Sequence, residues 1–586
     1  MKYPKIPLAQ TVIQLCKTKE LKHIVISPGS RNAPLTIGFS NDAYFNCYSI
    51  VDERCAAFFA LGIAQKLKKP VAVVCTSGSA LLNYYPAVAE AFYSDIPLIV
   101  LSADRPKHLI GIGDGQTINQ RYVFENHILF SANLKLDLKD EMNIPGHEEL
   151  PIFKNLEDKF ERFLGLQKDI QTYNEEGINT AINTAISKKG PVHINIPFDE
   201  PLYELVDKIS VSPRNIDSTV KPSKIEDYVL QSALEDWNSA SKKMILVGVL
   251  GPSEFEKKWL DELAEDDSVI VLTETTSNLH HSNFFPSIDQ LIAPLTDEEQ
   301  KALSPDILVT FGGLIVSKKI KQLLRKHKPK HHWHIDEKAA NDTFFCLNNH
   351  FEIAPNIFFE TFLPRITHYV KSRYKETWLA LKQYRLKRHK AYVNNIPFSD
   401  FKVFSEILKS VPEHYILQSG NSSAIRYMQL FKVKKDIEVY CNRGTSGIDG
   451  STSTAIGCAV ASEKPVLFIT GDLSFFYDSN AFWNNYIPSH FRVIVVNNQG
   501  GGIFRILPGQ KNTENFDTYF ETSHSLTAEH ICNMYGLNYE SVSNETDLAK
   551  ALNLFYTSSN SPKVLEVFTP RTLNDKILLE YFEFIR

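Results

Sequence analysis

Short apolar runs recur along the chain, and each is followed by a longer stretch in which apolar and polar residues mix. Runs of about 4–8 apolar residues are typical of parallel strands buried on both faces, whereas longer amphipathic stretches are typical of helices. Such an alternation predicts an α/β fold built on doubly wound parallel sheets. In the first third of the chain it predicts strands at 23–27, 44–51, 71–76, 97–102 and 192–196, with helices at 53–67 and up to Tyr93.

The same alternation restarts twice, each time after a break in the pattern. A polar stretch at about 207–224 is predicted to be a linker, and the charged segment at about 366–392 a helical connector. The middle part predicts strands at 244–249, 269–272, 307–311 and 332–335. The last part predicts strands at 415–418, 438–441, 466–470, 493–496 and 564–568. Because 586 residues exceed what one hydrophobic core supports, we predict three consecutive domains of this kind, at 1–206, 225–365 and 395–586.

Composition narrows the class of protein. Hydrophobic residues make up 43% and charged residues 22% of the chain, as in ordinary globular proteins. The net charge of −5 argues against nucleic acid or an anionic membrane as a partner. The eight cysteines are scattered without a Cys-x-x-Cys pair, which predicts reduced thiols in a cytoplasmic protein. No apolar run approaches the length needed to span a membrane.

Two loops in the last part of the chain carry oxygen-bearing side chains. Asp472 follows the predicted strand at 466–470, and Asn498 and Gly500 follow the one at 493–496. Ligands of open α/β sheets bind outside the carboxyl ends of the strands, so we expect the two loops to lie side by side. The Asp472 carboxylate, the Asn498 amide and the Gly500 carbonyl offer the hard oxygens that Mg²⁺ prefers, together with phosphate oxygens. The pattern predicts a magnesium-bridged diphosphate, with Mn²⁺ as the alternative ion.

The pair of loops resembles the binding motif of thiamine diphosphate enzymes, which reads Gly-Asp and then Asn-Asn some two dozen residues later. Leu473 stands where many members have a third glycine. The resemblance implies thiamine diphosphate as cofactor and a carboxylic acid that engages its aminopyrimidine ring. Glu53 lies at a predicted strand-to-helix junction and is the candidate for this catalytic role. From the residue alone, Glu53 is better explained as an acid that favours the helix dipole, and the catalytic role follows only from the resemblance.

Longer blocks narrow the resemblance to one family. They are Ser27-Pro28-Gly29-Ser30-Arg31, Asp52-Glu53-Arg54, Thr76-Ser77-Gly78, Ala103-Asp104-Arg105-Pro106, Asn442-Arg443-Gly444 through Gly450, Gly471-Asp472-Leu473-Ser474 and Asn497-Asn498 through Phe504. With these blocks the chain resembles, over essentially its whole length, the 2-succinyl-5-enolpyruvyl-6-hydroxy-3-cyclohexene-1-carboxylate (SEPHCHC) synthases of menaquinone biosynthesis. The resemblance implies decarboxylation of 2-oxoglutarate and addition of the resulting carbanion to isochorismate, with release of CO₂.

The family pattern also implies roles for individual residues. The implied substrate contacts are Arg31, Gln116, Lys318, Lys319, Ser422, Arg426 and Arg443. The implied cofactor contacts are Ser77, Gly78, Ile448, Asp472, Leu473, Ser474, Asn498, Ile503 and Phe504. Lys319 replaces the arginine usual in the family and cannot form its planar fork. Both implied substrates are dicarboxylates, which suits arginine, although any one of these cations could be a solvated surface charge.

Two other hypotheses stay open at this point. One is a different thiamine-diphosphate-dependent decarboxylase or carboligase, similar to acetolactate synthase, against which the arginine set argues. The other is a non-catalytic protein that keeps the fold, against which the retention of Glu53, Asp472 and Asn498 argues. The resemblance further implies a homodimer or a dimer of dimers, in which Glu53 and Asp472 of one site come from different chains.

Overall fold

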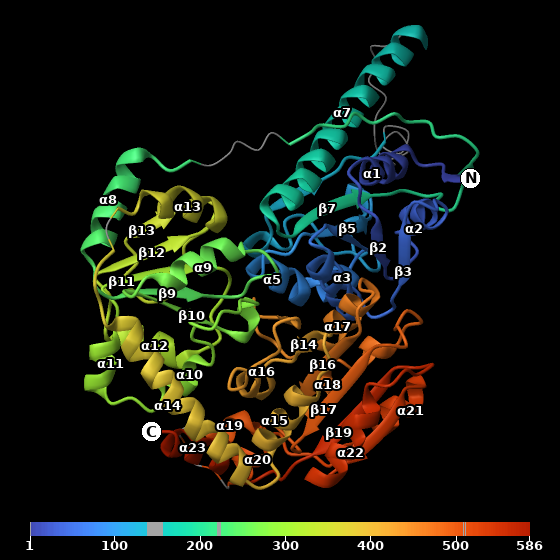
Figure 1. The fold of residues 1–586 in the computed structure, drawn as a ribbon. Coiled ribbons are helices and arrows are strands. Elements are labelled where there is room, and N and C mark those ends of the chain that lie inside the picture. The colour runs from blue at the N-terminus through green and yellow to red at the C-terminus, as the bar shows by residue number, and fades with distance from the viewer. Residues whose placement is uncertain are drawn as a thin grey trace. The chain divides into compact units, whose positions relative to one another are not determined.

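A computed structural model describes residues 2–137, 156–218, 224–367, 369–507, 509, 511 and 513–586. It contains two six-stranded sheets and one five-stranded sheet, each entirely parallel, as well as a two-stranded sheet formed by β1 (Tyr3–Pro4) and β8 (Leu205–Val206). Helices separate most of the successive strands (Figure 1). The predicted α/β fold with doubly wound parallel sheets is therefore confirmed.

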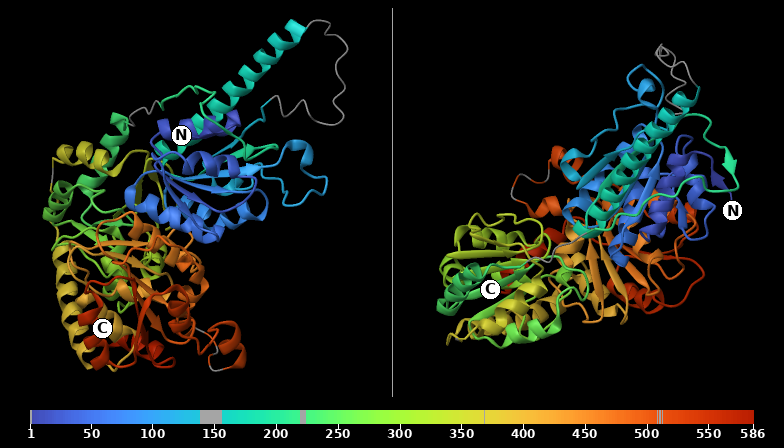
Figure 2. Two further views of the ribbon diagram at one scale, coloured as in Figure 1. Left: turned by 90° about the vertical axis from the view of Figure 1, so that its right-hand side faces the viewer. Right: turned by 90° about the horizontal axis from the view of Figure 1, so that it is seen from above.

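The first sheet has the order β3-β2-β4-β5-β7-β6. Its strands are β2 (His23–Ile26), β3 (Asn46–Ser49), β4 (Val71–Cys75), β5 (Leu98–Asp104), β6 (Phe130–Asn133) and β7 (Val192–Pro197). Its helices are α1 (Pro7–Thr18), α2 (Ala33–Ser40), α3 (Glu53–Leu67), α4 (Ser79–Asn83), α5 (Tyr85–Tyr93) and α7 (Leu156–Lys188). Helices α1, α2 and α7 share one hydrophobic cluster with the sheet, and the beginning of α7 extends beyond that sheet (Figures 1 and 2).

The second sheet has the order β10-β9-β11-β12-β13 and is apolar on both faces. Its strands are β9 (Lys243–Val247), β10 (Val269–Thr273), β11 (Ile307–Phe311), β12 (His331–Ile335) and β13 (Asn349–Phe351). The accompanying helices are α8 (Asp227–Ser239), α9 (Lys257–Glu265), α10 (Ile288–Ile292), α11 (Asp297–Leu303), α12 (Lys318–Lys326), α13 (Pro355–Phe362) and α14 (Tyr374–Asn395). Ile245 and Val247 face the cluster with α8, α9 and α13, whereas Met244 and Leu246 face the one with α10, α12 and α14. Burial on both faces is why such strands are continuous apolar runs.

The third sheet repeats the topology of the first, with the order β15-β14-β16-β17-β19-β18. Its strands are β14 (Ile416–Ser419), β15 (Glu438–Cys441), β16 (Val466–Gly471), β17 (Arg492–Asn497), β18 (Asn538–Val542) and β19 (Lys563–Phe568). Its helices are α15 (Asp400–Ser410), α16 (Ser423–Met428), α17 (Ser451–Val460), α18 (Asp472–Tyr477), α19 (Ile503–Ile506), α20 (Glu514–Tyr519), α21 (Glu529–Tyr535), α22 (Glu545–Phe555) and α23 (Asn574–Phe584). In such an order, the loops after β14 and β16 flank the point where the winding reverses, which is the usual ligand position.

In the three parallel sheets, three strands were not predicted, and each lies at the edge of its sheet. They are β6, β13 and β18. An edge strand has one neighbour only and needs fewer apolar residues, as the sequence Asn-Tyr-Glu-Ser-Val of β18 illustrates. The predicted helix at 53–67 matches α3 at both ends, whereas the charged connector begins at Tyr374 rather than near 366.

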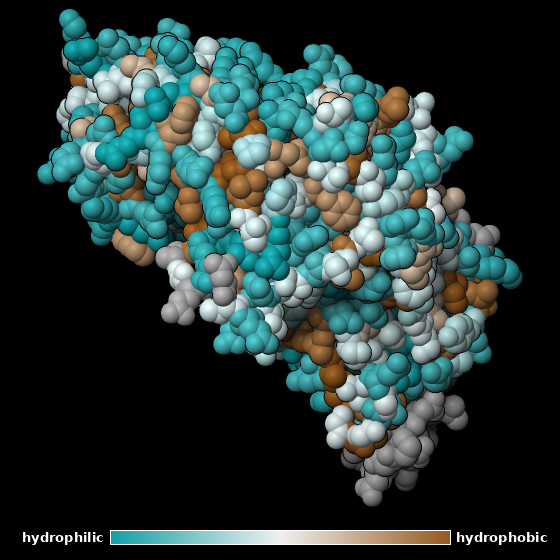
Figure 3. All heavy atoms as spheres, turned by 90° about the horizontal axis from the view of Figure 1, so that it is seen from below, coloured by the Kyte–Doolittle hydropathy of each residue, from teal (hydrophilic) through white to brown (hydrophobic). Residues whose placement is uncertain are grey.

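The contacts divide the chain into two compact units. The first unit comprises 1–220, 452–463 and 478–487, and the second comprises 221–451, 464–477 and 488–586. The predicted three-domain boundaries stay a prediction. No helix in the described ranges is long and apolar enough to cross a membrane. Hydrophilic side chains predominate on the face drawn in Figure 3, where hydrophobic ones form separate patches.

Candidate active site

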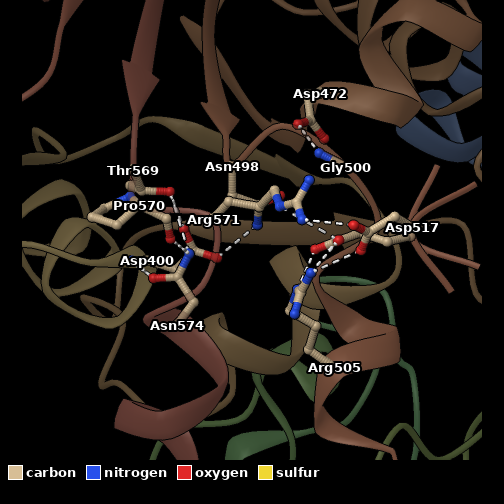
Figure 4. Close-up of polar contacts among 11 residues, drawn as sticks. Asp400, Asp472, Asn498, Gly500, Arg505, Asp517, Thr569, Pro570, Arg571 and Asn574 are labelled. Atoms are coloured by element: carbon tan, nitrogen blue, oxygen red, sulfur yellow. Dashed lines mark hydrogen bonds and ion pairs between the residues drawn. The ribbon is translucent and has the colours of Figure 1, made fainter. Parts of the chain in front are cut away.

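The two oxygen-bearing loops meet at the carboxyl edge of the third sheet. Strands β16 and β17 pair with Gly471 opposite Val496, so Asp472 and Asn498 follow their strands at the same edge. Asp472 is buried and is the first residue of α18. Its Oδ2 accepts a hydrogen bond of 3.0 Å from the backbone N–H of Gly500 (Figure 4). The structure thus joins the predicted metal-binding residues within the second unit.

Gly500 is required at its position for two reasons. Its φ of +149° is unfavourable for other residues, and a Cβ there would lie 2.7 Å from the backbone oxygen of Glu521. The neighbouring Gly501 donates its N–H to that same oxygen at 2.6 Å. The Gly500 carbonyl accepts one hydrogen bond, from Gly502 at 3.0 Å, and a carbonyl oxygen has a second lone pair for a metal.

The oxygens at this edge fit a divalent metal ion. The Asn498 side chain is buried, and its Oδ1 has no hydrogen-bond partner among the described residues. Leaving a buried acceptor unsatisfied costs about 1–3 kcal/mol, so such an atom indicates a missing ligand. An amide oxygen, a carboxylate and a carbonyl together form the donor set expected for Mg²⁺ or Mn²⁺.

Asp400 is held on the opposite side of Asn498. Its Oδ2 accepts from Asn498 Nδ2 at 2.9 Å, and its Oδ1 accepts from Thr569 Oγ1 at 2.6 Å. Burial raises the pKa of Asp400 to about 6, although the hydrogen bonds from Thr569 and Asn498 act in the opposite direction. The backbone N–H of Asp400 donates to Asn574 Oδ1 at 2.8 Å (Figure 4). Sequence analysis did not find this residue, because it lies far from the motif along the chain.

His524 is a further neighbour of Asp472 that sequence analysis missed. Its Nε2 lies 3.3 Å from Asp472 Oδ2, and its backbone N–H donates to the Gln499 oxygen at 3.2 Å. Its Nδ1 accepts the N–H of Leu526 at 3.1 Å, so in the neutral ring Nε2 carries the hydrogen. The histidine thus lies within ion-pair distance of the carboxylate, although its Nε2 makes no hydrogen bond in the described part of the chain. Through its backbone it links the 520–526 segment to the loop that carries Gly500.

A buried ion pair fixes the loop that follows Gly500. Arg505 donates from Nε and Nη2 to the two carboxylate oxygens of Glu521, and both side chains are buried. Asp517 accepts from Arg505 at 3.3 Å and from Arg571 at 3.2 Å (Figure 4). Breaking a buried ion pair by removing one partner typically costs about 3–5 kcal/mol, so this loop is strongly anchored.

The remaining predicted cofactor residues of this unit lie in the same two loops or close to them. Ser474 donates from Oγ to the backbone oxygen of Ile448 at 3.0 Å, which links the start of α18 to that residue. Phe504 is exposed, and its ring lies 6.2 Å from that of Phe520, centroid to centroid. The half-buried members of the set are Ile448, Leu473 and Ile503.

Arg426 and Arg443, predicted to bind substrate, lie near enough for the charge of one to affect the other. Burial lowers the pKa of Arg426, and the positive charge of Arg443 lowers it further, whereas Asp289 opposes both. Arg443 follows β15 and donates from Nη1 to Asn421 Oδ1 at 2.7 Å. Asn421 in turn donates to the backbone oxygens of Asn442 and Gly447, so it fixes the Arg443 loop. Sequence analysis did not identify Asn421. The predicted Ser422 beside it is exposed.

Lys318 and Lys319 are the first residues of α12, and both are exposed. Burial raises the pKa of Asp289. The hydrogen bond from the Ser317 hydroxyl and the positive charges of Arg426 and Lys319 oppose this rise. The charges of Lys319 and Arg426 thus both act on the Asp289 carboxyl group. That the two residues serve one site stays a prediction.

Glu274 holds the segment that leads into α12. Its carboxylate accepts the backbone N–H groups of Val316 and Ser317, each at 2.7 Å. Burial raises the pKa of Glu274 to about 7, against the effect of these two hydrogen bonds and of Arg443. Lys321, which was not predicted, lies near Glu274 and Arg443, and burial lowers its pKa. The second unit therefore gathers several cations around the acids Glu274 and Asp289.

Glu53 lies in the first unit, where it is half-buried at the start of α3. Asp52 caps this helix by accepting the N–H of Cys55 at 3.1 Å, and Asn83 Nδ2 donates to Glu53 Oε2 at 3.2 Å. A Cβ on Gly62 of α3 would lie 2.0 Å from the Thr454 oxygen of α17, so the two helices pack backbone against backbone. This packing fixes the helix that presents Glu53.

Among the other predicted residues of the first unit, Arg31 follows β2, and Ser77 and Gly78 follow β4. Arg31 is largely buried and donates from Nη1 to the Phe198 oxygen at 3.1 Å, with Glu200 at 3.3 Å. Burial lowers the pKa of Arg31, against the effect of Glu200, and the positive charge of Arg105 lowers it further. Arg105 donates to Ser77 Oγ at 2.9 Å. Arg105 was noticed in the sequence only as part of a matching block.

Gly78 and Gln116 lie against one another through their backbones. Gly78 has a φ of +88°, and a Cβ there would lie 3.0 Å from the Gln116 oxygen. The Gly78 N–H donates to Oε1 of the fully buried Gln120 at 2.9 Å. The side chain of Gln116 is exposed. Sequence analysis predicted Gln116 and missed Gln120, which holds the Gly78 loop.

Comparison with known families agrees with this arrangement. Residues 6–131 match the model described as "Thiamine pyrophosphate enzyme, N-terminal TPP binding domain". Residues 218–412 match "Middle domain of thiamine pyrophosphate", and residues 419–567 match "Thiamine pyrophosphate enzyme, C-terminal TPP binding domain". The segment that carries Glu53 and the segment that carries Asp472 and Asn498 therefore both fall in domains described as binding thiamine pyrophosphate.

Curated relatives narrow the family. Proteins from Christiangramia forsetii, Flavobacterium psychrophilum and Flavobacterium johnsoniae are 56%, 55% and 53% identical to the chain. Each match covers 100% of this chain and 100% of the relative, and each relative is named 2-succinyl-5-enolpyruvyl-6-hydroxy-3-cyclohexene-1-carboxylate synthase. The chain belongs to this family. As a member of the SEPHCHC synthase family it is an enzyme of the thiamine diphosphate-dependent type, as the sequence motifs predicted.

Proposed function

We propose that this chain catalyses the thiamine-diphosphate-dependent decarboxylation of 2-oxoglutarate and the addition of the resulting carbanion to isochorismate, giving SEPHCHC and CO₂. This is a step of menaquinone biosynthesis. The names of its relatives support the reaction. The observation that carries the choice of substrates is the pair Arg426 and Arg443, because two neighbouring guanidinium groups suit substrates that each bear two carboxylates. In a reaction like that of acetolactate synthase, the acceptors are smaller and less charged, so such a pair of arginines would have no role.

The metal-binding edge would hold the diphosphate end of the cofactor. Asp472, Asn498 and the Gly500 carbonyl would bind Mg²⁺ or Mn²⁺, as the unsatisfied oxygen of Asn498 supports. When bound, thiamine diphosphate supplies the carbon nucleophile for the reaction. Further contacts to the cofactor would come from Ile448, Leu473, Ser474, Ile503 and Phe504 of the second unit and from Ser77 and Gly78 of the first.

Glu53 would hold and exchange the proton that activates the cofactor. Its carboxyl group can both donate and accept a proton, and the Asn83 amide fixes the orientation of Oε2. Substrate carboxylates would be bound by Arg31 in the first unit and by Arg426, Arg443, Lys318 and Lys319 in the second, with Gln116 and Ser422 as further contacts. The exposure of Gln116 and Ser422 leaves their side chains accessible to a substrate.

A substrate-dependence assay tests the proposed reaction. The purified protein, loaded with thiamine diphosphate and Mg²⁺, is expected to consume 2-oxoglutarate and release CO₂ at a substantial rate only when isochorismate is present. Pyruvate should not replace 2-oxoglutarate. Turnover of pyruvate with itself as acceptor would instead support the acetolactate-synthase-like reaction.

The arginine pair gives a second prediction. Arg426→Ala and Arg443→Ala should each raise the KM for one or both substrates by about 10-fold or more, because a charge-assisted hydrogen bond is typically worth about 1.5–3 kcal/mol. Steady-state kinetics with each substrate varied in turn measures the effect. Arg373→Ala is the matched control, since Arg373 is exposed and pairs with Glu376 on the surface. Unchanged kinetics toward both substrates in both variants would exclude the pair from the site.

We also propose a homodimer as the smallest active species, with Glu53 of one chain and Asp472 of its partner serving one site; the family resemblance supports this. Inactive Glu53→Gln and Asp472→Ala chains, refolded together, should then regain about a quarter of wild-type activity, because half of the dimers carry one intact site. No recovery, despite heterodimers demonstrated by mass spectrometry, would assign both groups of a site to one chain.

We propose a cytoplasmic location for the protein. All eight cysteines lie in the described residues, and none of them forms a disulfide. Reduced thiols are typical of cytoplasmic proteins, which supports the proposal.

A further inference from the structure

The nitrogen of the Asn498 side-chain amide makes a hydrogen bond, whereas its oxygen makes none within the described residues. Its Nδ2 donates to Asp400 Oδ2 at 2.9 Å, whereas its Oδ1 is buried and has no hydrogen-bond partner in the described part of the chain. Asp472 contacts the same loop through the N–H of Gly500. The unbound oxygen is therefore the atom of Asn498 that remains for a ligand.

Asp400, which binds the amide, is itself held through both its carboxylate and its backbone. Thr569, at the end of β19, donates its hydroxyl to Asp400 Oδ1 at 2.6 Å, and Asn574, the first residue of α23, accepts the Asp400 N–H at 2.8 Å. Asn574 also donates from Nδ2 to the Pro570 oxygen at 3.0 Å. Ser399 caps α15, whose first residue is Asp400. Figure 4 shows Asp400 beside Thr569, Asn574 and Asn498. Only 2% of Asp400 is exposed, so its carboxylate has little freedom to turn away.

We propose that Asp400 is a positioning residue that turns the Asn498 oxygen toward the metal ion. A carboxylate accepts hydrogen bonds, so the end of the amide that faces Asp400 must be the NH₂ group, and the oxygen must point the other way. An isolated asparagine has no such preference, since its two ends have nearly the same shape. Partners behind metal ligands commonly orient them in this manner. The inference rests on the proposed metal role of Asn498.

The test uses a substitution that preserves shape. In Asp400→Asn two amides face each other, and the new residue can donate to the Asn498 oxygen, which turns the Asn498 NH₂ group toward the metal. The variant should bind Mn²⁺ about 10- to 100-fold more weakly in the presence of thiamine diphosphate, the usual cost of losing such a partner. Electron paramagnetic resonance of free Mn²⁺ measures this affinity without turnover. The control is Asp547→Asn, because Asp547 accepts from the Asn544 amide at 2.8 Å in an equivalent pair on the surface.

A swapped pair separates orientation from general damage. In Asp400→Asn combined with Asn498→Asp, the amide at 400 donates to one oxygen of the new carboxylate and leaves the other oxygen for the metal. The total charge is conserved, and the double variant should regain most of the Mn²⁺ affinity lost in Asp400→Asn. If Asp400→Asn does not fold, the swap alone decides: near-wild-type affinity supports the proposal, and weak affinity overturns it.

Asn498→Leu distinguishes this proposal from the metal site itself. Unchanged Mn²⁺ affinity in Asn498→Leu would show that Asn498 does not bind the metal ion, and the proposed role of Asp400 would fail as well. Weaker binding in Asn498→Leu, with wild-type binding in Asp400→Asn, would overturn the role of Asp400 alone. Circular dichroism melts without metal should show equal midpoints for Asp400→Asn and Asp547→Asn, a result that a purely structural role of Asp400 does not give.

Discussion

Glu53→Gln is expected to lower kcat by about 100- to 10 000-fold, the usual contribution of a positioned acid–base group, while the fold stays intact. The amide keeps the size of the side chain and can still accept the hydrogen bond from Asn83, but it cannot exchange a proton. The direct readout is exchange of the thiazolium C2 proton of bound thiamine diphosphate for deuterium, followed by NMR.

Two comparisons support the interpretation of this variant. Cofactor affinity should change little, because the diphosphate would be held by other residues. Glu176→Gln, at an exposed glutamate that pairs with Arg214, should leave both kcat and proton exchange unchanged. Wild-type exchange in Glu53→Gln would show that another group activates the cofactor.

Asp472→Ala is expected to weaken Mg²⁺ and thiamine diphosphate binding together, because the ion would bridge the protein and the diphosphate. The loss of metal affinity should exceed about 100-fold, since removing even an outer partner of a metal ligand typically costs 10- to 100-fold. The measurement is calorimetric titration of thiamine diphosphate at several Mg²⁺ concentrations. In the variant, cofactor affinity should no longer depend on Mg²⁺.

The described residues offer a matched control for the metal site. Glu413, His414 and Asp436 form a surface cluster whose side chains could also hold a metal ion. Asp436→Ala should leave the Mg²⁺ dependence of cofactor binding unchanged. If the dependence is lost in Asp436→Ala and kept in Asp472→Ala, the cofactor-linked ion is bound at the surface cluster.

The sequence alone determined the sheets and the loops that carry the chemistry. Strands buried on both faces consist mostly of apolar residues. The strands β9, β11 and β16 can therefore be recognised in the sequence as apolar runs. The helix predicted at 53–67 is α3, so the sequence placed Glu53 at the start of a helix. Because parallel strands end at one edge, the positions of Asp472 and Asn498 after neighbouring strands were enough to bring them together.

Only the tertiary structure decided which residues support that chemistry. Edge strands such as β18 need little apolar sequence, since one side lacks a neighbour, and they were missed. Asp400 binds Asn498 through one hydrogen bond, and Asn421 binds Arg443 through another. The residues of each pair lie apart in the sequence, and no sequence motif connects them. Hydrogen bonds of this kind leave no periodicity in the chain, because any polar residue at a suitable place in space can make them. The sequence thus specifies the groups that perform the reaction, and the folded chain specifies the groups that orient them.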